Sequence, residues 1–199
     1  MSTHVAAILL AAGRSRRMGA CKQLLPLGKN TVIGCCLETL ISAGIDPIVV
    51  VVSPEGGSVA DAVKPYPAAI AVNNCEDGDM ASSVCAGRDA LTPACSGVIV
   101  ALGDSPLVRH ATVAALAGCH AAFPDRIIIP VHEGRRGHPV LFPRPILDEL
   151  AAAMTLRDLL RHDPDRIRHL NVHDQGILVD LDTPDDYRRV CAGAHAERS

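Results

Sequence analysis

A chain of 199 residues with a net charge of −3 has no overall attraction for nucleic acid or anionic lipid, so positive charge has to act locally. With 48% hydrophobic residues and no apolar segment near the ~20 residues that span a membrane, the composition predicts one globular domain over residues 1–199. We expect a core at about 4–191, a flexible C-terminal tail and, because basic residues follow the first apolar run, a cytoplasmic protein without a signal peptide.

Apolar runs alternate along the chain with helical patterns. The expected strands are, in order, HVAAILLAA, IDPIVVVVS, AAIAVNN, GVIVAL, RIIIPV, PVLF, IRHLNV and GILVDLD. Helices are expected at 31–43, after Ser58, at 81–91 and at 112–122. Near-continuous Val, Ile and Leu runs are typical of strands covered on both faces. The order predicts an α/β three-layer sandwich, Rossmann-like, with a mostly parallel open sheet and helices on both faces.

The eight cysteines contain no C-x-x-C pair, so a zinc or iron–sulfur site of that kind is not indicated. Several lie in apolar helical patterns, such as Cys36 beside Leu37, and are expected to pack as small hydrophobic residues. Cys21 differs because it lies in a charged loop, where a reactive thiol is the alternative.

That charged loop, AAGRSRRMGACK, follows the first strand. Its glycines, Gly13 and Gly19, are too far apart for G-x-G-x-x-G, and the G-K-[ST] ending of a Walker A loop is missing. Glycines let backbone N–H groups approach a ligand, Arg17 can fork across phosphate oxygens, and Lys22 supplies a point charge. The loop therefore predicts a polyphosphate cradle, with a solvated basic turn as the alternative.

Two acidic residues each follow an expected strand. Asp104 comes after GVIVAL and Asp182 ends GILVDLD, so both are expected at the sheet edge where ligands bind. Mg²⁺ is held by one or two carboxylates together with substrate phosphates, which makes this pair the predicted metal site. The alternative for Asp182 is a helix start in DTPDDY, with Thr183 or Asp182 as the N-cap. Asp180 is assigned to the strand.

The charged loop resembles the opening signature of the MobA-like nucleotidyltransferases, in particular the molybdenum cofactor cytidylyltransferases. The signature L-A-A-G-x-S-x-R-M-G-x-x-K-x-L-L-P is filled from Leu10 to Pro26. The resemblance implies a nucleotide-diphospho-sugar-transferase-like fold. Guanylyltransferase relatives carry L-A-G-G, so Ala12 favours CTP over GTP. The residues that the resemblance assigns to nucleotide binding are Leu10, Ala11, Ala12, Gly13, Arg17, Lys22, Ser82 and Asp104.

Three later segments extend the resemblance. The family's G-D-x-P and D-x-D-T-P motifs contain Asp104 and Asp182, although Ser105 stands where relatives have Met or Gln. NNCEDGDMASSVCAGRDAL follows a family segment that places Ser82, and less strongly Ser83, at a helix N-terminus facing base or phosphate, with plain helix capping as the alternative.

The third segment, RGHPVLF, matches the family pattern R-G-H-P-V-x-F and assigns Arg136, Gly137 and His138 to the acceptor side. A loop histidine that only contacts solvent is the alternative for His138. The chain lacks the G-D-x-G turn that relatives place near the acceptor, before the helix at TLRDLLRHDP.

The activity implied by the resemblance is Mg²⁺-dependent transfer of CMP from CTP to the terminal phosphate of molybdopterin, with release of pyrophosphate. Arg17, Lys22 and Asp104 would act in catalysis, and Asp104 and Asp182 would hold the metal. One alternative keeps the chemistry but uses GTP or another small phosphate acceptor. The other is a non-catalytic carrier that delivers the cofactor to a molybdoenzyme.

Overall fold

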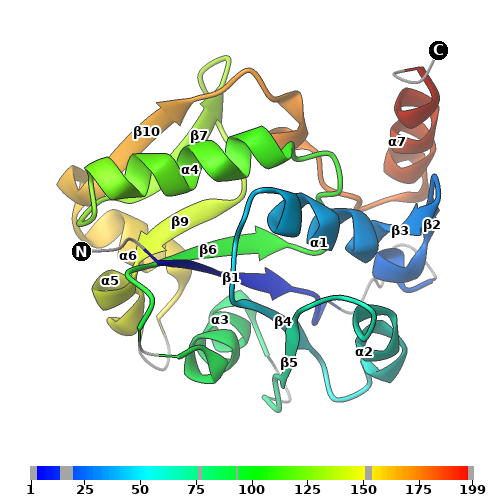
Figure 1. The fold of residues 1–199 in the computed structure, drawn as a ribbon, viewed down its shortest axis with the longest axis horizontal. Helices are drawn as coiled ribbons and strands as arrows, with labels where there is room; N and C mark the ends of the chain where they lie inside the picture. The colour runs from blue at the N-terminus through cyan, green and yellow to red at the C-terminus, as the bar shows by residue number, and fades with distance from the viewer. Residues whose placement is uncertain (1–3, 14–19, 76–77, 93, 151–153, 197–199) are drawn as a thin grey trace.

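The computed structural model describes residues 4–13, 20–75, 78–92, 94–150 and 154–196 (Figure 1). In these ranges one mixed sheet contains the strands β1 (Val5–Leu10), β4 (Ile48–Val52), β5 (Ala69–Val72), β6 (Gly97–Leu102), β7 (Ile127–His132), β8 (Arg135–Arg136), β9 (Val140–Pro143) and β10 (Ile167–Asn171). Their order is β10-β7-β9-β6-β1-β4-β5, with β8 paired to β7. Strands β5, β4, β1 and β6 run parallel, whereas β9 is antiparallel to its neighbours β6 and β7.

Helices cover both faces of the sheet. Helices α1 (Val32–Ser42), α2 (Gly57–Val63) and α4 (His110–Ala122) pack on one face, and α3 (Met80–Ala90), α5 (Arg144–Asp148) and α6 (Leu156–His162) pack on the other. Alternate residues of a strand contact opposite layers, so Leu9 faces the first set of helices and Ile8 the second. The predicted three-layer α/β sandwich is confirmed.

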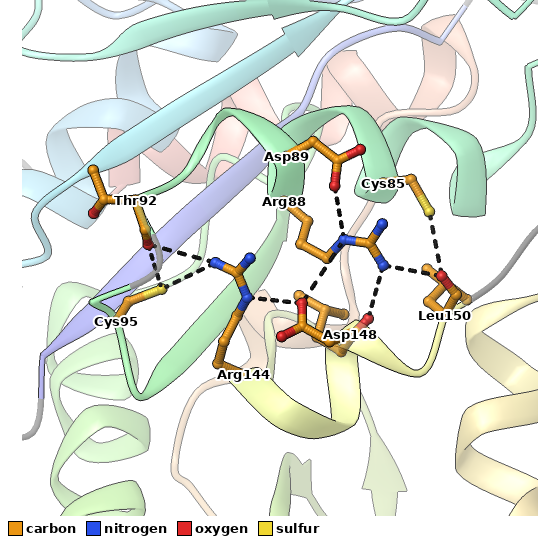
Figure 2. Close-up of polar contacts among 9 residues, drawn as sticks. Cys85, Arg88, Asp89, Thr92, Cys95, Arg144, Asp148 and Leu150 are labelled. Atoms are coloured by element: carbon orange, nitrogen blue, oxygen red, sulfur yellow. Dashed lines mark hydrogen bonds and ion pairs between the residues drawn. The ribbon is translucent and has the colours of Figure 1, made fainter.

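A polar network fixes α3 to α5 (Figure 2). Arg88, near the C-terminal end of α3, donates from Nη1 to the carbonyl oxygen of Leu150 at 2.9 Å and to that of Leu147 at 3.3 Å. Arg144 at the start of α5 donates from Nε to Asp148 at 2.8 Å. Because Arg88 donates to two backbone carbonyl groups at and just beyond the end of α5, the network holds the far end of α3 in place.

The predicted strand GILVDLD was wrong. Residues Gln175–Leu178 form a short 3-10 helix, η3, and residues 179–182 continue outside the sheet. The reason is Asp174, a buried carboxylate that accepts hydrogen bonds from the backbone N–H of Gly176 at 2.9 Å and of Arg109 at 2.9 Å. These bonds start the 3-10 turn and tie the segment to the N-terminus of α4, so the apolar residues pack there.

Helix α7 (Pro184–Ala196) packs against a small hairpin of β2 (Pro26–Leu27) and β3 (Asn30–Thr31), as Figure 1 shows at the C-terminal end of the chain. Thr183 caps α7, because its hydroxyl accepts from Asp186 N at 3.2 Å while the Asp186 carboxylate accepts from Thr183 N at 2.8 Å. Hydrogen bonds from the Thr183 side chain and then from Arg189, together with those from the backbone N–H groups of Thr183 and Asp182, lower the pKa of Asp186 to about 2. Of the two predicted caps, Thr183 performs that role and the Asp182 side chain faces elsewhere.

All eight cysteines are free thiols, and Cys36 is buried among hydrophobic residues as predicted. Burial raises the pKa of the Cys36 thiol. Cys21 is exposed and donates from Sγ to Gln23 at 3.2 Å. Among the described helices, none has both the length and the apolar character of a membrane-spanning segment. The expected C-terminal tail includes residues 197–199, which lie outside the described residues.

Candidate active site

The loop after β1 is anchored at the carboxyl edge of the sheet. Ala11 N donates to Val51 O, and Gly103 N donates to Leu10 O, both at 2.8 Å. These bonds extend the parallel pairing beyond the ends of β1 and β6, so the loop begins beside the segment that carries Asp104. Arg17, the predicted phosphate-binding arginine, lies outside the described residues.

Lys22 lies between two carboxylates that are far away in the sequence. It begins the 3-10 helix η1 (Lys22–Leu24), and its ammonium forms an ion pair with Asp104. The same Nζ lies 3.2 Å from Oδ1 of Asp182, 160 positions along the chain. The side chains of Lys22 and Asp104 are 11% and 18% exposed, against 48% for Asp182, so the pair with Asp104 is the better shielded from solvent. The structure thus brings three predicted site residues together.

The charge state of Lys22 follows from these contacts. Burial by itself lowers the pKa of the ammonium, but the hydrogen bonds and charges of Asp104 and then Asp182 outweigh burial and place the pKa above its ordinary value. Lys22 is therefore a cation at neutral pH, and it offsets part of the negative charge of the two carboxylates.

A cavity of about 360 Å³ opens beside this cluster, which is in the size range of small-molecule sites. The loop after β1, the N-terminus of α3 and the segment before α7 each supply part of the wall. The lining residues are Leu10, Ala12, Gly13, Lys22, Gln23, Gly78, Asp79, Met80, Ser83, Leu102, Asp104, Asp180 and Asp182. Ligands of open α/β sheets bind at this edge, beyond the carboxyl ends of the strands.

The wall formed by α3 is organised by Asn73, a buried residue that the sequence analysis missed. Asn73 follows β5, and its Nδ2 donates to the hydroxyls of Ser82 and Ser83, each at 2.9 Å. Asp79 caps the helix by accepting from Ser82 N at 2.8 Å. Ser83 lines the cavity directly, whereas Ser82 lies in the cap. No spacing signal distinguishes Asn73 from an ordinary loop asparagine.

Replacing Asn73 with alanine is expected to loosen this wall. The change removes the shared donor of two hydroxyls, one of them buried, which corresponds to about 1–3 kcal/mol of folding free energy. We expect a lower unfolding temperature and a KM for the nucleotide that rises by about tenfold or more. Thermal unfolding and initial-rate kinetics measure the two effects. Asn171→Ala on the exposed face of β10 is the control, and an unchanged KM in Asn73→Ala would contradict the assignment.

The turn that carries the predicted acceptor residues packs against η3, the element that precedes Asp182 in the chain. Arg136 is exposed on β8, and Gly137 N donates to Pro130 O at 3.0 Å. His138 is half-buried, with its backbone N–H donating to Ile177 O at 2.9 Å, and it lines a separate cavity of about 20 Å³. None of these three residues is among the described residues that line the larger cavity.

Asp180 is a further residue of the main cavity, and the sequence analysis had assigned it to a strand interior. Ser105 connects it to the segment after β6, donating from Oγ to Asp180 Oδ1 at 2.6 Å, while Leu181 N donates to Asp104 O at 3.0 Å. The signal for Asp180 was its spacing of two from Asp182, because residues two apart in an extended segment point to the same side.

The donor set fits a divalent cation that binds together with phosphate. Among the described residues, no three His, Cys, Asp or Glu side chains gather closely enough to hold a metal by themselves. Asp104 and Asp182 nevertheless offer carboxylate oxygens at one edge of the cavity. One or two carboxylates, completed by phosphate oxygens and water, are the usual protein contribution to a Mg²⁺ site in phosphoryl transfer.

An α/β sheet with this cavity, a buried lysine and two carboxylates beyond its strand ends defines an enzyme of the nucleotidyltransferase class. The chain belongs to the MobA-like NTP transferase family, whose domain matches residues 7–169.

Curated relatives of similar length have different names. The chain is 29% identical to nicotine blue oxidoreductase of Paenarthrobacter nicotinovorans, covering 94% of this chain and 96% of that protein. It is also 29% identical to purine catabolism protein PucB of Bacillus subtilis, covering 95% and 97%. Identity to the molybdenum cofactor cytidylyltransferase of Escherichia coli is 25%, covering 90% and 92%. These relatives therefore have names that refer to different processes.

Among solved structures, Rv0371c of Mycobacterium tuberculosis is 30% identical, with a TM-score of 0.83 over 96% of this chain and all of that one. A complex of Rv0371c with manganese superposes with a TM-score of 0.77 at 26% identity, over 96% of this chain and all of that one. Nucleotidyltransferases of this kind typically use divalent metals, in agreement with the oxygen donors of this site.

Proposed function

We propose that the enzyme transfers CMP from CTP to the terminal phosphate of a molybdopterin-type acceptor, in the cytoplasm, with Mg²⁺ as the metal and pyrophosphate as the leaving group. The observation that carries the proposal is the position of Lys22 between Asp104 and Asp182 at the edge of the cavity. The Escherichia coli relative supports the acceptor. Ala12, which lines the cavity, supports CTP through the L-A-A-G motif.

The reaction needs no nucleophile from the protein. An oxygen of the acceptor phosphate forms a bond to the α-phosphorus of CTP, and the bond from that phosphorus to the bridging oxygen of pyrophosphate breaks. The protein contributes positioning and charge stabilisation. Lys22, and Arg17 from the charged loop, would neutralise the triphosphate. Asp104 and Asp182 would hold Mg²⁺, which when bound neutralises phosphate charge and orients the triphosphate.

We assign Arg136, Gly137 and His138 to the acceptor side. Support comes from the backbone hydrogen bond between His138 and Ile177, which joins their turn to the segment leading to Asp182. The acceptor, once joined to CMP, would then pass to a molybdoenzyme.

A matrix of nucleotides and acceptors tests this function. CTP, GTP, ATP and UTP are each incubated with the protein and Mg²⁺, with purified molybdenum-bound molybdopterin or with a sugar phosphate, and pyrophosphate release is measured. We expect release only with CTP and the pterin. Release with GTP in place of CTP would overturn the cytidylyl assignment, release with the sugar phosphate would overturn the acceptor, and tight pterin binding without turnover would support a carrier.

A further inference from the structure

Lys22 contacts the same two carboxylates that are proposed to hold the metal. Its Nζ is ion-paired with Asp104 and lies 3.2 Å from Asp182 Oδ1. The contact with Asp104 is largely shielded from solvent, at 11% exposure for the lysine side chain and 18% for the aspartate. The ammonium of Lys22 therefore contacts the same carboxylate oxygens that a divalent ion would use.

The ammonium and a divalent ion compete for these oxygens. Two positive charges held by the same pair of carboxylates repel each other, and the repulsion is stronger where water is partly excluded. Mg²⁺ also gives up its water reluctantly, so carboxylates already neutralised in part by Lys22 offer it little. With Lys22 in this position, the site is expected to bind free metal weakly.

A nucleoside triphosphate changes this balance. Lys22 lines the cavity, so phosphate oxygens bound there come within reach of its flexible four-carbon stem without movement of η1. The phosphates give the ammonium new partners and bring further oxygens for the metal. Binding of nucleotide and metal then favour each other, by the same factor in either order of addition.

We propose that Lys22 is a resident counter-ion that keeps divalent metal off Asp104 and Asp182 until a nucleoside triphosphate draws the ammonium onto its phosphates. Lys22 thereby sets the order of binding, in which metal enters with the nucleotide. The proposal rests on the proposed function only in assigning the metal to these two carboxylates, and it holds for any nucleotide and acceptor.

Mn²⁺ binding to the free protein tests the proposal, measured by the electron paramagnetic resonance signal of unbound Mn²⁺. Lys22→Met removes the charge and keeps the length, and we expect it to bind Mn²⁺ about tenfold more tightly than wild type without nucleotide. Lys22→Arg keeps the charge and should bind as weakly as wild type. Lys29→Met removes one charge from the exposed β2–β3 turn and controls for the overall change in net charge.

The opposite result for Lys22→Met would overturn the proposal. If Lys22 orients the carboxylates for the metal, Lys22→Met binds Mn²⁺ no more tightly than wild type, and the proposal fails. Tight binding must also disappear in Lys22→Met combined with Asp182→Asn, since otherwise the metal binds elsewhere. If Lys22→Met unfolds by circular dichroism, Lys22→Gln replaces it.

A measurement on wild-type protein needs no variant: at least one of CTP, GTP, ATP and UTP should raise its Mn²⁺ affinity by about 5- to 150-fold, after subtraction of the Mn²⁺ that the same nucleotide binds without protein. Equal affinity with and without each of the four nucleotides would overturn the proposal. Failure of CMP transfer alone leaves the comparison of Lys22→Met with wild type valid. The two proposals therefore fail separately.

Discussion

Replacing Asp104 with asparagine is expected to lower the rate of pyrophosphate release by about a hundredfold or more while the fold survives. The change keeps the shape of the side chain and removes its charge. Asp104 forms the shielded ion pair with Lys22 and lies at the cavity, so it is the better placed of the two proposed metal ligands. We expect the loss mainly in kcat at saturating Mg²⁺, because the interaction that is lost stabilises charge during transfer.

The control is Asp61→Asn, which removes an equal charge from a surface pair with Lys64, where both side chains are about 70% exposed (71% and 69%). Exposed pairs of this kind contribute little to stability, so this variant should keep the wild-type rate and unfolding temperature. Circular dichroism and thermal unfolding establish that Asp104→Asn is folded. A folded Asp104→Asn with a rate within about twofold of wild type would remove Asp104 from the mechanism.

Most strands could be predicted because the buried sheet leaves a plain record in the sequence. Every residue of β4, Ile48–Val52, is buried. Its run of valines identifies it as a strand without any information about the strands beside it. GILVDLD has the same appearance, but residues 176–178 belong to η3 and residues 179–182 continue outside the sheet. The deciding contacts are hydrogen bonds that the Asp174 carboxylate accepts from the backbone N–H of Gly176 and from that of Arg109, which lies 65 positions from Asp174. A contact between residues this far apart in the chain cannot be predicted from the local pattern of apolar residues.

The candidate site divides in the same way. Asp104 and Asp182 were predicted because each follows an apolar run, and the edge rule for α/β sheets applies even though the second run is not a strand. The bridge made by Lys22 between them depends on how η1 turns after the loop, which no spacing encodes. Asn73 was missed for a similar reason, since its importance comes from two serines that it meets only after α3 has formed.

Gly137 is the position where family resemblance and packing give different explanations. The resemblance assigns it to the acceptor side, but a Cβ built on Gly137 would collide with the carbonyl oxygen of Ile177 and would lie 2.7 Å from Ile177 Cγ1. The adjacent His138 N–H donates to that same carbonyl at 2.9 Å. The turn thus fits against η3 only without a side chain, and η3 leads directly to the segment that carries Asp180 and Asp182.

Gly137→Ala is therefore expected to destabilise the protein by about 1–3 kcal/mol, because a backbone carbonyl must shift to admit the methyl group. For a chain of this length the unfolding temperature should fall by about 2–12 °C, and kcat should fall with it as Asp182 is displaced. The control is Gly118→Ala in the exposed middle of α4, where a Cβ meets no atom within 4 Å, and where we expect slight stabilisation. Scanning calorimetry and pyrophosphate release measure both variants. A different result would contradict this explanation: a Gly137→Ala protein that unfolds at the wild-type temperature but no longer binds the acceptor. Gly137 would then be required for contact with the substrate, and packing against η3 would not explain why a glycine stands there.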